Sequence, residues 1–459
     1  MKRRLEVDPL HGPILKNMLL FGLPIVGSSI LHVLFSAADT AVIGNFGHEG
    51  AISAIGVCMP VCHLLIAGLG ALSGGVTIVF GRMYGRKETD KVSDLVQALP
   101  LTAFTLGAAL AIVACVLSTP ILRLVNCPES LFAEARVYFC IYFAAVPFSM
   151  TQYFLASVLQ SRGNSFIPFV FQMSAAVVNI ILNLIFVIVF DWNIAGVASA
   201  TLFSQMLSST AMVIFYTRQR DEIRLHLNRM RVFTGLGEVF RVGIPSSLEG
   251  MIINISGVVI SAAINKFDPV VIAGNTLSGT LEGFMSISFV AFSSSGVVFI
   301  SQNYGHRDLP RVRRIFRTTL AGVLIAGEVI GFLVYLASPY VLKIFSPDAG
   351  IITYARVRLF YMCMFYGLCG TLNAISGCVR GLGNTKLPLA ISVISSFFFR
   401  ITWIYTYAAW KGTIEAIYMA YPICWAINTV LNVAAFYYVF KQRAAELEAD
   451  VPEEVPLEN

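Results

Sequence analysis

Charged residues are scarce in this chain of 459 residues, and the scarcity excludes a soluble protein. Asp, Glu, Lys and Arg together make up only 13% of the sequence, whereas a typical soluble domain contains about 25%. Hydrophobic residues make up 57%, and the mean hydropathy is +0.76. A chain of this composition is expected to place long apolar segments in a membrane.

Motifs for nucleotide binding, metal binding and covalent catalysis are also missing. The sequence has no Gly-rich P-loop, no HExxH pair and no GxSxG turn, so neither an ATP-driven process nor an enzyme is expected. Of nine cysteines, only Cys127 falls in an expected loop, which excludes a disulfide framework. Cys58, Cys62 and His63 have the elements of a metal site, but within an apolar helix we interpret them as packed side chains.

The apolar residues form twelve stretches, each long enough to cross a bilayer as a helix of about 20 residues or more. They cover residues 15–44, 51–80, 94–119, 131–160, 166–190, 193–217, 238–265, 270–301, 316–339, 351–379, 387–410 and 414–440. Most of the 32 Lys and Arg residues fall in the connections on one side of these stretches. The positive-inside rule then predicts that both termini lie in the cytoplasm. The expected location is the bacterial cell (cytoplasmic) membrane, which the chain crosses several times.

The second half of the sequence repeats the first half about 220 residues later. Phe21-Gly22-Leu23-Pro24 returns as Val242-Gly243-Ile244-Pro245, and Tyr84-Gly85-Arg86-Lys87 returns as Tyr304-Gly305-His306-Arg307. Six stretches per half, both starting inside, predict parallel repeats, an arrangement common in secondary transporters. The expected parts are an N-terminal lobe 1–217, a cytoplasmic linker 218–237, a C-terminal lobe 238–441 and a disordered acidic tail 442–459.

Four polar residues occur at similar depths inside apolar stretches of the first half. Asp39 lies in the first stretch, Asn179 and Asn183 lie one turn apart in the fifth, and Thr201 lies in the sixth. A carboxyl group in apolar surroundings is costly to charge, so Asp39 is a candidate for binding and releasing a proton. We predict that the four residues form a cation-coupling site. The alternative is that the asparagines only join helices through hydrogen bonds.

The repeat offers an internal comparison for this cluster. The second copy has Ile260 at the position of the acid, and Phe399 and Trp403 at the positions of the two asparagines. A polar cluster required by the fold alone would tend to recur in both copies. The comparison therefore favours a function specific to the first half.

The second half carries acids of its own. Glu249, Glu282 and Glu328 each lie near the middle of an apolar stretch. Arg356 and Arg358 are assigned to the outer side of the membrane, and Arg400 is the one arginine expected inside it, so the three acids cannot all be in ion pairs. We predict that Glu249 and Glu282 line a substrate cavity, where they would attract cations or form an alternative ion site. Glu328 could instead face a groove between helices.

Two prolines occupy equivalent positions in the repeats. Pro24 and Pro245 each lack a backbone N–H and so interrupt the hydrogen bonding of a long helix. We predict that they act as hinges. The alternative is a static kink filled by neighbouring side chains.

Several short motifs together resemble a known family. They are Gly22-Leu23-Pro24, residues 38–44, Asn179-Ile180-Ile181-Leu182-Asn183, residues 196–201, Gln302-Asn303-Tyr304-Gly305 and residues 380–385. With the twelve stretches and the repeat, they make residues 14–440 similar to the multidrug and toxic compound extrusion (MATE) family. This resemblance implies an all-α fold of two six-helix bundles in a V-shaped arrangement that alternates between inward- and outward-facing states.

The resemblance also implies a function. Members of that family export cationic amphiphilic drugs in exchange for H⁺ or Na⁺, and proton-coupled members carry an acid at the position of Asp39 with polar residues at those of Asn179, Asn183 and Thr201. Glu249 matches an acid of sodium-coupled members. Their further aspartate has no counterpart, because residues 366–371 contain no acid.

The combined prediction is an antiporter that exports cationic amphiphilic drugs or metabolites by alternating access. The coupling ion is H⁺ or, alternatively, Na⁺, and no other cofactor is expected. Expected partners are small organic cations and membrane lipids, with no nucleic acid, and the chain is expected to work as a monomer. A channel, a membrane enzyme, and a flippase for lipid-linked oligosaccharides or polyprenyl phosphates are the alternatives. A flippase would need cationic residues along its cavity, where this sequence offers mainly acids.

Overall fold

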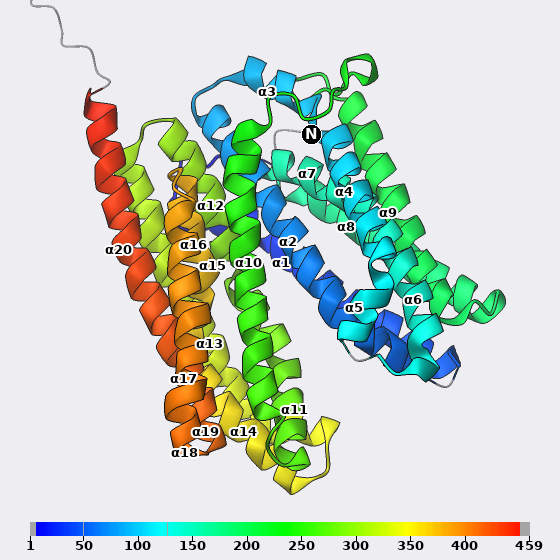
Figure 1. Ribbon diagram of the computed structural model, residues 1–459. Coiled ribbons are helices and arrows are strands. Elements are labelled where there is room, and N and C mark those ends of the chain that lie inside the picture. Colours follow the sequence, from blue (N-terminus) through cyan, green and yellow to red (C-terminus); the bar gives the residue numbers. More distant parts are fainter. Residues whose placement is uncertain (1–5, 49, 126, 450–459) are drawn as a thin grey trace, which may run out of the picture. The chain divides into compact units, whose positions relative to one another are not determined.

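The computed structural model describes residues 6–48, 50–125 and 127–449, and all regular structure in these ranges is helical (Figure 1). Lys2, Arg3, Arg4 and residues 450–459 of the expected tail lie outside the described residues. The helices of the first half are α1 (Ile14–Phe46), α2 (Ala51–Gly85), α3 (Thr89–Val96), α4 (Leu99–Val116), α5 (Ser118–Leu124), α6 (Glu129–Ala144), α7 (Val146–Ser161), α8 (Phe166–Asn183), the π-helix η2 (Leu184–Val189) and α9 (Asn193–Thr217).

After the short 3₁₀ turn η3 (Leu227–Arg229), the second half follows the same order. Its elements are α10 (Gly237–Ile264), α11 (Pro269–Met285), η4 (Ser286–Phe289), α12 (Val290–Gly305), α13 (Leu309–Phe345), α14 (Ala349–Cys363), α15 (Tyr366–Gly381), α16 (Lys386–Ser392), η5 (Val393–Phe398), α17 (Phe399–Trp403), η6 (Ile404–Ala408), α18 (Ala409–Lys411), α19 (Ile414–Tyr418) and α20 (Ala420–Ala449).

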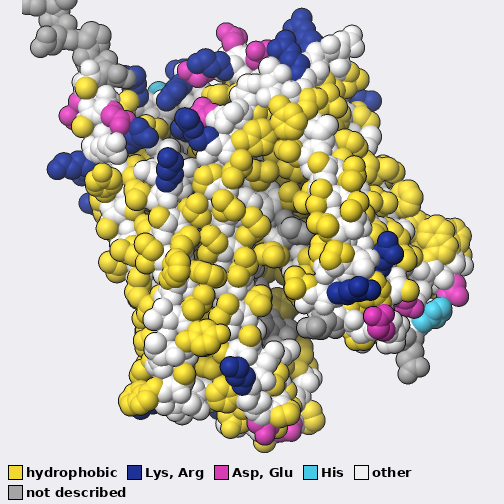
Figure 2. Space-filling view, viewed as in Figure 1, with side chains coloured by type: hydrophobic (Ala, Val, Ile, Leu, Met, Phe, Trp, Pro, Cys, Tyr) yellow, Lys and Arg dark blue, Asp and Glu magenta, His cyan; other side chains and the backbone are white. Residues whose placement is uncertain are grey.

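Eleven helical stretches of the described chain are long and apolar enough to cross a membrane. The pair α14 and α15 forms a twelfth, bent by 48° at the break after Cys363, and it corresponds to the predicted stretch 351–379. In Figure 2, hydrophobic side chains cover most of the visible sides of the helices, while Lys and Arg gather mainly toward helix ends. The predicted all-helical, twelve-span fold is confirmed.

The chain packs as two compact units that do not follow the repeats. Unit 1 contains Met1–Asp8 and Leu20–Met251, and unit 2 contains Pro9–Leu19 and Ile252–Asn459. Two of the three boundaries therefore lie inside a helix, one in α1 and one in α10, and the third lies before α1, between Asp8 and Pro9. The predicted lobes 1–217 and 238–441 remain a division by sequence, whereas the first part of each repeat's leading helix packs with the other unit.

Small residues explain why the first part of α10 belongs to unit 1. A Cβ on Gly75 in α2 would lie only 2.8 Å from the backbone nitrogen of Gly243 in α10, so the two helices meet backbone to backbone. Nearby, Ser247 Oγ donates to the carbonyl oxygen of Gly68 over 2.7 Å. Glycine at such a crossing permits the close approach that helix packing in lipid requires.

Apolar side chains fill the interior of each unit. In unit 1, Cys58, Cys62, Phe139 and Phe143 are all fully buried in one cluster, and Cys58 Sγ lies 3.4 Å from the carbonyl oxygen of Ala135. These two cysteines are therefore packing residues of the core, which is common for a free cysteine.

Pro24 and Pro245 both lie inside continuous α-helices. Ser28 Oγ donates to the carbonyl oxygen of Pro24 over 3.2 Å, and Ser246 Oγ donates to that of Val242 over 2.9 Å. Hydroxyl groups thus supplement the backbone hydrogen bonds near each proline. The hinge role of the prolines stays a prediction.

The prediction of a disordered tail is wrong for residues 442–449, which are helical. Helix α20 continues to Ala449, and Arg443 Nη1 lies 2.5 Å from Glu446 Oε2 one turn later. The segment is rich in Ala, Glu and Leu, which favour helix, and it extends a helix that already exists, so no new nucleation is needed.

Candidate functional site

A π-helix follows directly after Asn183. Helix α8 ends at this residue and η2 begins at Leu184. Unit 2 repeats the feature, since the π-helix η6 follows directly after Trp403, the residue equivalent to Asn183. The π-helical turn therefore belongs to the repeated fold, and only the side chains beside it differ.

The structure brings the four predicted polar residues together in unit 1. Asn183 Nδ2 donates to Asp39 Oδ1, and it lies 3.2 Å from Asn179 Oδ1, which also accepts from it. Asn179 Nδ2 in turn donates to Thr201 Oγ1 over 3.4 Å. Asn183 is fully buried and Asn179 is nearly so. One chain of side-chain hydrogen bonds thus connects α1, α8 and α9.

The hydrogen bonding of this cluster can be arranged in two ways. If the side-chain amide of Asn179 is rotated by half a turn, so that its oxygen and nitrogen exchange places, the nitrogen donates to Asp39 Oδ1 over 3.1 Å. The oxygen then accepts from the backbone nitrogen of Thr201 over 3.3 Å. Asn183 Oδ1 is buried without a hydrogen-bond partner among the described residues. Since no Lys or Arg of the described chain forms an ion pair with Asp39, its carboxyl group depends on these amides.

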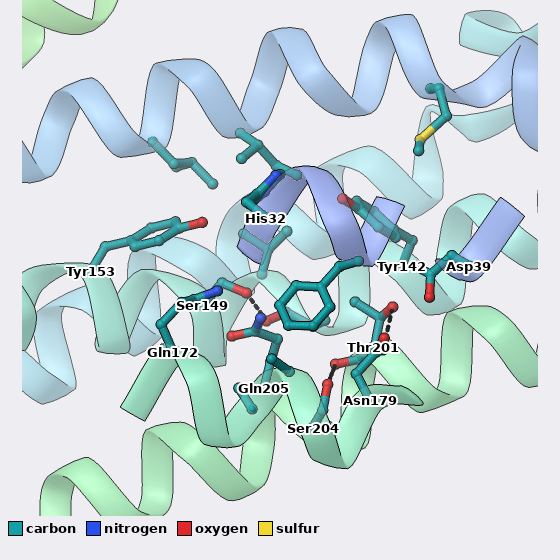
Figure 3. A pocket seen from close by; sticks show the side chains of 18 of the residues that line it. His32, Asp39, Tyr142, Ser149, Tyr153, Gln172, Asn179, Thr201, Ser204 and Gln205 are labelled. Carbon is teal, nitrogen blue, oxygen red and sulfur yellow. Dashed lines mark hydrogen bonds between the residues drawn. The ribbon is translucent and has the colours of Figure 1, made fainter. Parts of the chain in front are cut away.

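A cavity of about 110 Å³ lies beside the cluster, entirely within unit 1 (Figure 3). Asp39, Asn179 and Thr201 line it, and so does His32, two turns before Asp39 on the same helix. The remaining lining residues are Phe35, Met59, Ile66, Leu69, Tyr138, Tyr142, Ala145, Val146, Ser149, Tyr153, Gln172, Ala175, Ala176, Ser204 and Gln205. The cavity is therefore mixed in polarity, with the acid on its wall.

Several polar residues of this cavity were not singled out from the sequence. Gln172 lies two turns before Asn179 on the same face of α8, and Gln152 Nε2 donates to its Oε1 over 3.2 Å. Tyr142 and Tyr153 come from α6 and α7. The seven-residue spacing between Gln172 and Asn179 was a usable signal, whereas the tyrosines occur in apolar helices without a distinguishing pattern.

The equivalent place in unit 2 is apolar. Ile260 is fully buried in a cluster with Trp403 and Tyr407 packed against it. The rings of Trp403 and Tyr407 lie 4.6 Å apart, and the indole nitrogen of Trp403 donates to the carbonyl oxygen of Ala416 over 2.8 Å. Aromatic packing thus occupies the place where unit 1 has amides and a carboxyl group.

Glu282 is not a free carboxylate, which corrects the expectation that Arg400 is the one arginine inside the apolar helices. Arg358 is 7% exposed, and its Nη2 lies 2.6 Å from Glu282 Oε2. Arg358 Nη1 also donates to Ser278 Oγ over 2.9 Å. Counting Arg358 with the residues outside the membrane missed this pair, because α14 carries the arginine into the core beside α11.

The side chain of Glu328 forms a hydrogen bond at the bend between α14 and α15. Its Oε2 accepts from the backbone nitrogen of Gly367, in the first turn of α15, over 2.9 Å. The break in the helix leaves such N–H groups without an intrahelical partner, and a carboxylate is well suited to accept from them.

Glu249 was predicted, together with Glu282, to line a substrate cavity. Its side chain is 2% exposed, and it lies in the part of α10 that belongs to unit 1.

Comparisons with known proteins agree with this arrangement. The MatE family model matches residues 24–185 and again residues 245–406. The chain is 22% identical over 437 residues to the probable multidrug resistance protein YoeA of Bacillus subtilis, covering 93% of this chain and 94% of that protein. It is 25% identical over 348 residues to the multidrug export protein MepA of Staphylococcus saprophyticus, covering 75% and 77%. The bent form of the Vibrio cholerae MATE transporter VcmN superposes with a TM-score of 0.83 at 21% identity, covering 95% and 98%.

The duplicated set of apolar helices and the polar cluster inside one unit define a multi-span membrane transporter. The two matched halves of the family model coincide with the sequence repeat. This chain belongs to the MatE family of transporters, which confirms the family indicated by its motifs.

Proposed function

We propose that this protein is an antiporter that exports cationic amphiphilic drugs or metabolites in exchange for protons, by alternating access across the bacterial cytoplasmic membrane. The proposed orientation has both termini in the cytoplasm, as the distribution of Lys and Arg favours. The names of the relatives YoeA and MepA support a multidrug substrate range. The observation that carries the proposal is the hydrogen bond from Asn183 to Asp39 beside a cavity of unit 1.

Protonation of Asp39 would change the hydrogen bonds that connect α1 with α8. An ionised carboxylate can only accept hydrogen bonds, so it can accept one from the side-chain amide of Asn183 and one from that of Asn179. A protonated carboxyl group donates through one oxygen, and the unpartnered Asn183 Oδ1 is an acceptor within the same cluster. Proton binding would thus favour a different amide arrangement and, with it, a different packing of α1.

Unit 2 is poorly suited to bind the coupling cation near Glu282. Its carboxylate already pairs with Arg358, and Arg400 lies buried nearby, with its guanidinium 5.0 Å from the ring centre of Tyr421. A carboxylate that already pairs with a guanidinium attracts a further cation only weakly. The proposed coupling site therefore consists of Asp39, Asn179, Asn183 and Thr201. Glu249 is retained as the alternative ion or substrate site.

The unit 1 cavity fits an ion-coupling role better than a drug-binding role. Its volume of about 110 Å³ is below the roughly 300 Å³ of the smallest usual ligand pockets. None of its lining residues is Lys or Arg. A diphosphate is therefore not expected to bind in this cavity, and the multidrug names of the relatives do not favour the flippase alternative.

Transport by purified protein in liposomes tests the proposal. Efflux of a fluorescent organic cation is measured under an H⁺ gradient or a Na⁺ gradient, for the wild type, Asp39→Asn and Glu249→Gln. Asp90→Asn, which changes an exposed acid of α3, is the matched control. Export driven by H⁺ and lost only in Asp39→Asn is the expected result. Export driven by Na⁺ and lost in Glu249→Gln would move the coupling site to Glu249, and unaltered export by Asp39→Asn would overturn the mechanism.

A further inference from the structure

Unit 2 contains a second pocket, far in sequence from the polar cluster. It has a volume of about 480 Å³ and lies between α13, α14 and α19. Its lining residues are Tyr335, Ile352, Thr353, Arg356, Val357, Phe360, Tyr361 and Glu415. The volume is in the range of roughly 300–1,000 Å³ that suits a small ligand. The pocket combines three aromatic rings with one charge of each sign.

Neither charge of this pocket is paired within the described chain. Arg356 Nε is buried without a hydrogen-bond partner, and its guanidinium lies 5.7 Å from the ring centre of Tyr335. The carboxylate of Glu415 forms no hydrogen bond or ion pair with a described residue, although it lines the same pocket. A partly buried charge without a partner is costly. The pair is therefore arranged for a ligand that carries both signs.

Aromatic residues at this end of unit 2 indicate the level of the membrane surface. Tyr340, Tyr405 and Trp410 are between 70% and 77% exposed, and the Lys411 ammonium lies 5.3 Å from the ring centre of Trp410. Exposed Tyr and Trp with flanking Lys are typical of the boundary between hydrocarbon and headgroups. Tyr340 lies in the last turns of α13, and Trp410 comes shortly before the start of α19, so two of the helices that line the pocket end or begin near these residues. We therefore infer that the pocket lies at the depth of the lipid headgroups.

We propose that this pocket binds the phosphoethanolamine headgroup of a membrane phospholipid. Arg356 would hold the phosphate through charge-assisted hydrogen bonds. The primary ammonium would lie between the Glu415 carboxylate and the rings of Tyr335 and Tyr361, which attract cations. The acyl chains would follow the exposed apolar surface of α13 and α14, which includes Phe332, Leu336 and Phe360.

The repeat again supplies a comparison. Arg136 occupies the position of Arg356 in the first half, but Ala195 stands in place of Glu415 and Cys115 in place of Tyr335. Unit 1 thus has the arginine without the carboxylate and the ring. A headgroup with both charges is expected to bind the unit 2 pocket alone, and Arg136 is the natural control.

The test measures lipid retained by the purified full-length protein. The protein is equilibrated in detergent with equal amounts of phosphatidylethanolamine, phosphatidylglycerol and phosphatidylcholine, and the bound lipid is quantified by mass spectrometry. The wild type is expected to retain mainly phosphatidylethanolamine. Arg356→Gln is expected to weaken this retention about tenfold, because a hydrogen-bonded charge pair is lost. Glu415→Gln is expected to remove the preference over phosphatidylcholine, whose ammonium has no N–H to donate. Arg136→Gln is expected to match the wild type.

Three results would overturn the proposal. The first is a wild type that retains the three lipids equally. The second is an Arg356→Gln variant that elutes as folded protein and retains phosphatidylethanolamine unchanged. The third concerns the source of the headgroup. If soluble glycerophosphoethanolamine displaces the lipid at comparable concentration, the pocket recognises a free zwitterion and not a membrane lipid.

Discussion

The side-chain amide of Asn183 donates a hydrogen bond to the carboxyl group of Asp39, although 144 residues separate them in the sequence. This bond connects α1 with α8 and places the one acid of the cluster beside a cavity of unit 1. The equivalent residues of unit 2, Ile260 and Trp403, pack in an apolar cluster. The same fold therefore carries a polar contact in one unit and an apolar one in the other.

Replacing Asn183 by Leu tests whether this contact serves coupling. The variant removes the donor to Asp39 and leaves Asn179 in place. Because a hydrogen bond to a charged group contributes about 1.5–3 kcal/mol, we expect H⁺-driven export to fall about tenfold or more. Initial rates of efflux from liposomes measure the effect, with Asn45→Leu, an exposed position of α1, as control. Equal loss in both variants would indicate damage to α1 packing and contradict a coupling role.

The pair of Glu282 and Arg358 is expected to stabilise unit 2. Glu282→Gln leaves the buried guanidinium of Arg358 without its charge partner, and breaking such a pair costs about 3 kcal/mol. The measurement is the Tm in detergent for Glu282→Gln, Arg358→Met and Glu282→Gln combined with Arg358→Met. A double variant that is at least as stable as each single one would show the expected coupling. Strictly additive losses would show that the two residues do not act as a pair.

Glu328 is expected to act as a helix cap and not as an ion site. Gln keeps an oxygen that can accept from the Gly367 nitrogen, whereas Ala removes the acceptor. We expect Glu328→Gln to leave the Tm and export nearly unchanged, and Glu328→Ala to lose about 1–2 kcal/mol of stability. Thermal unfolding and the liposome assay check both. Loss of export in a stable Glu328→Gln protein would assign the carboxylate a role in transport.

Two adjacent glycines of α2 are expected to respond oppositely to alanine. A Cβ on Gly74 would meet no atom within 4 Å, while one on Gly75 would lie 2.8 Å from the Gly243 nitrogen. Gly74→Ala is expected to stabilise the helix by about 0.5–1 kcal/mol. Gly75→Ala forces α2 and α10 apart and is expected to cost about 1–3 kcal/mol. A Tm that moves in the same direction in both variants would contradict the close crossing.

The site could be predicted from the sequence in part. The depths of Asp39, Asn179, Asn183 and Thr201 indicated one cluster, and in the structure hydrogen bonds connect these side chains. Depth along a helix follows directly from residue spacing, so this part needed no tertiary information. The tyrosines and Gln172 on the cavity wall depend on how α6, α7 and α8 are rotated toward one another, which spacing alone does not give.

The expectation that Arg400 is the one arginine inside the membrane failed for the same reason. Arg358 was counted outside the apolar core, yet it reaches Glu282 from a helix 76 residues further along the chain. Whether a charged residue near a helix end faces water or the interior depends on the helix beside it. The hydrophobic pattern likewise does not reveal the bend between α14 and α15. The bend depends on another helix, because the Glu328 carboxylate accepts a hydrogen bond from the N–H exposed at the break.

The sequence by itself determined the class of this protein, its twelve spans, its repeat and its family. Hydrophobicity is a local property, and the cost of exposing a backbone to lipid leaves helices as the only solution for long apolar segments. Only the tertiary structure decided which charges are paired and where the packing units divide. One boundary falls inside α10 because the glycines Gly75 and Gly243 bring helices of different repeats into backbone contact. Such contacts depend on three-dimensional shape, which no single stretch of sequence contains.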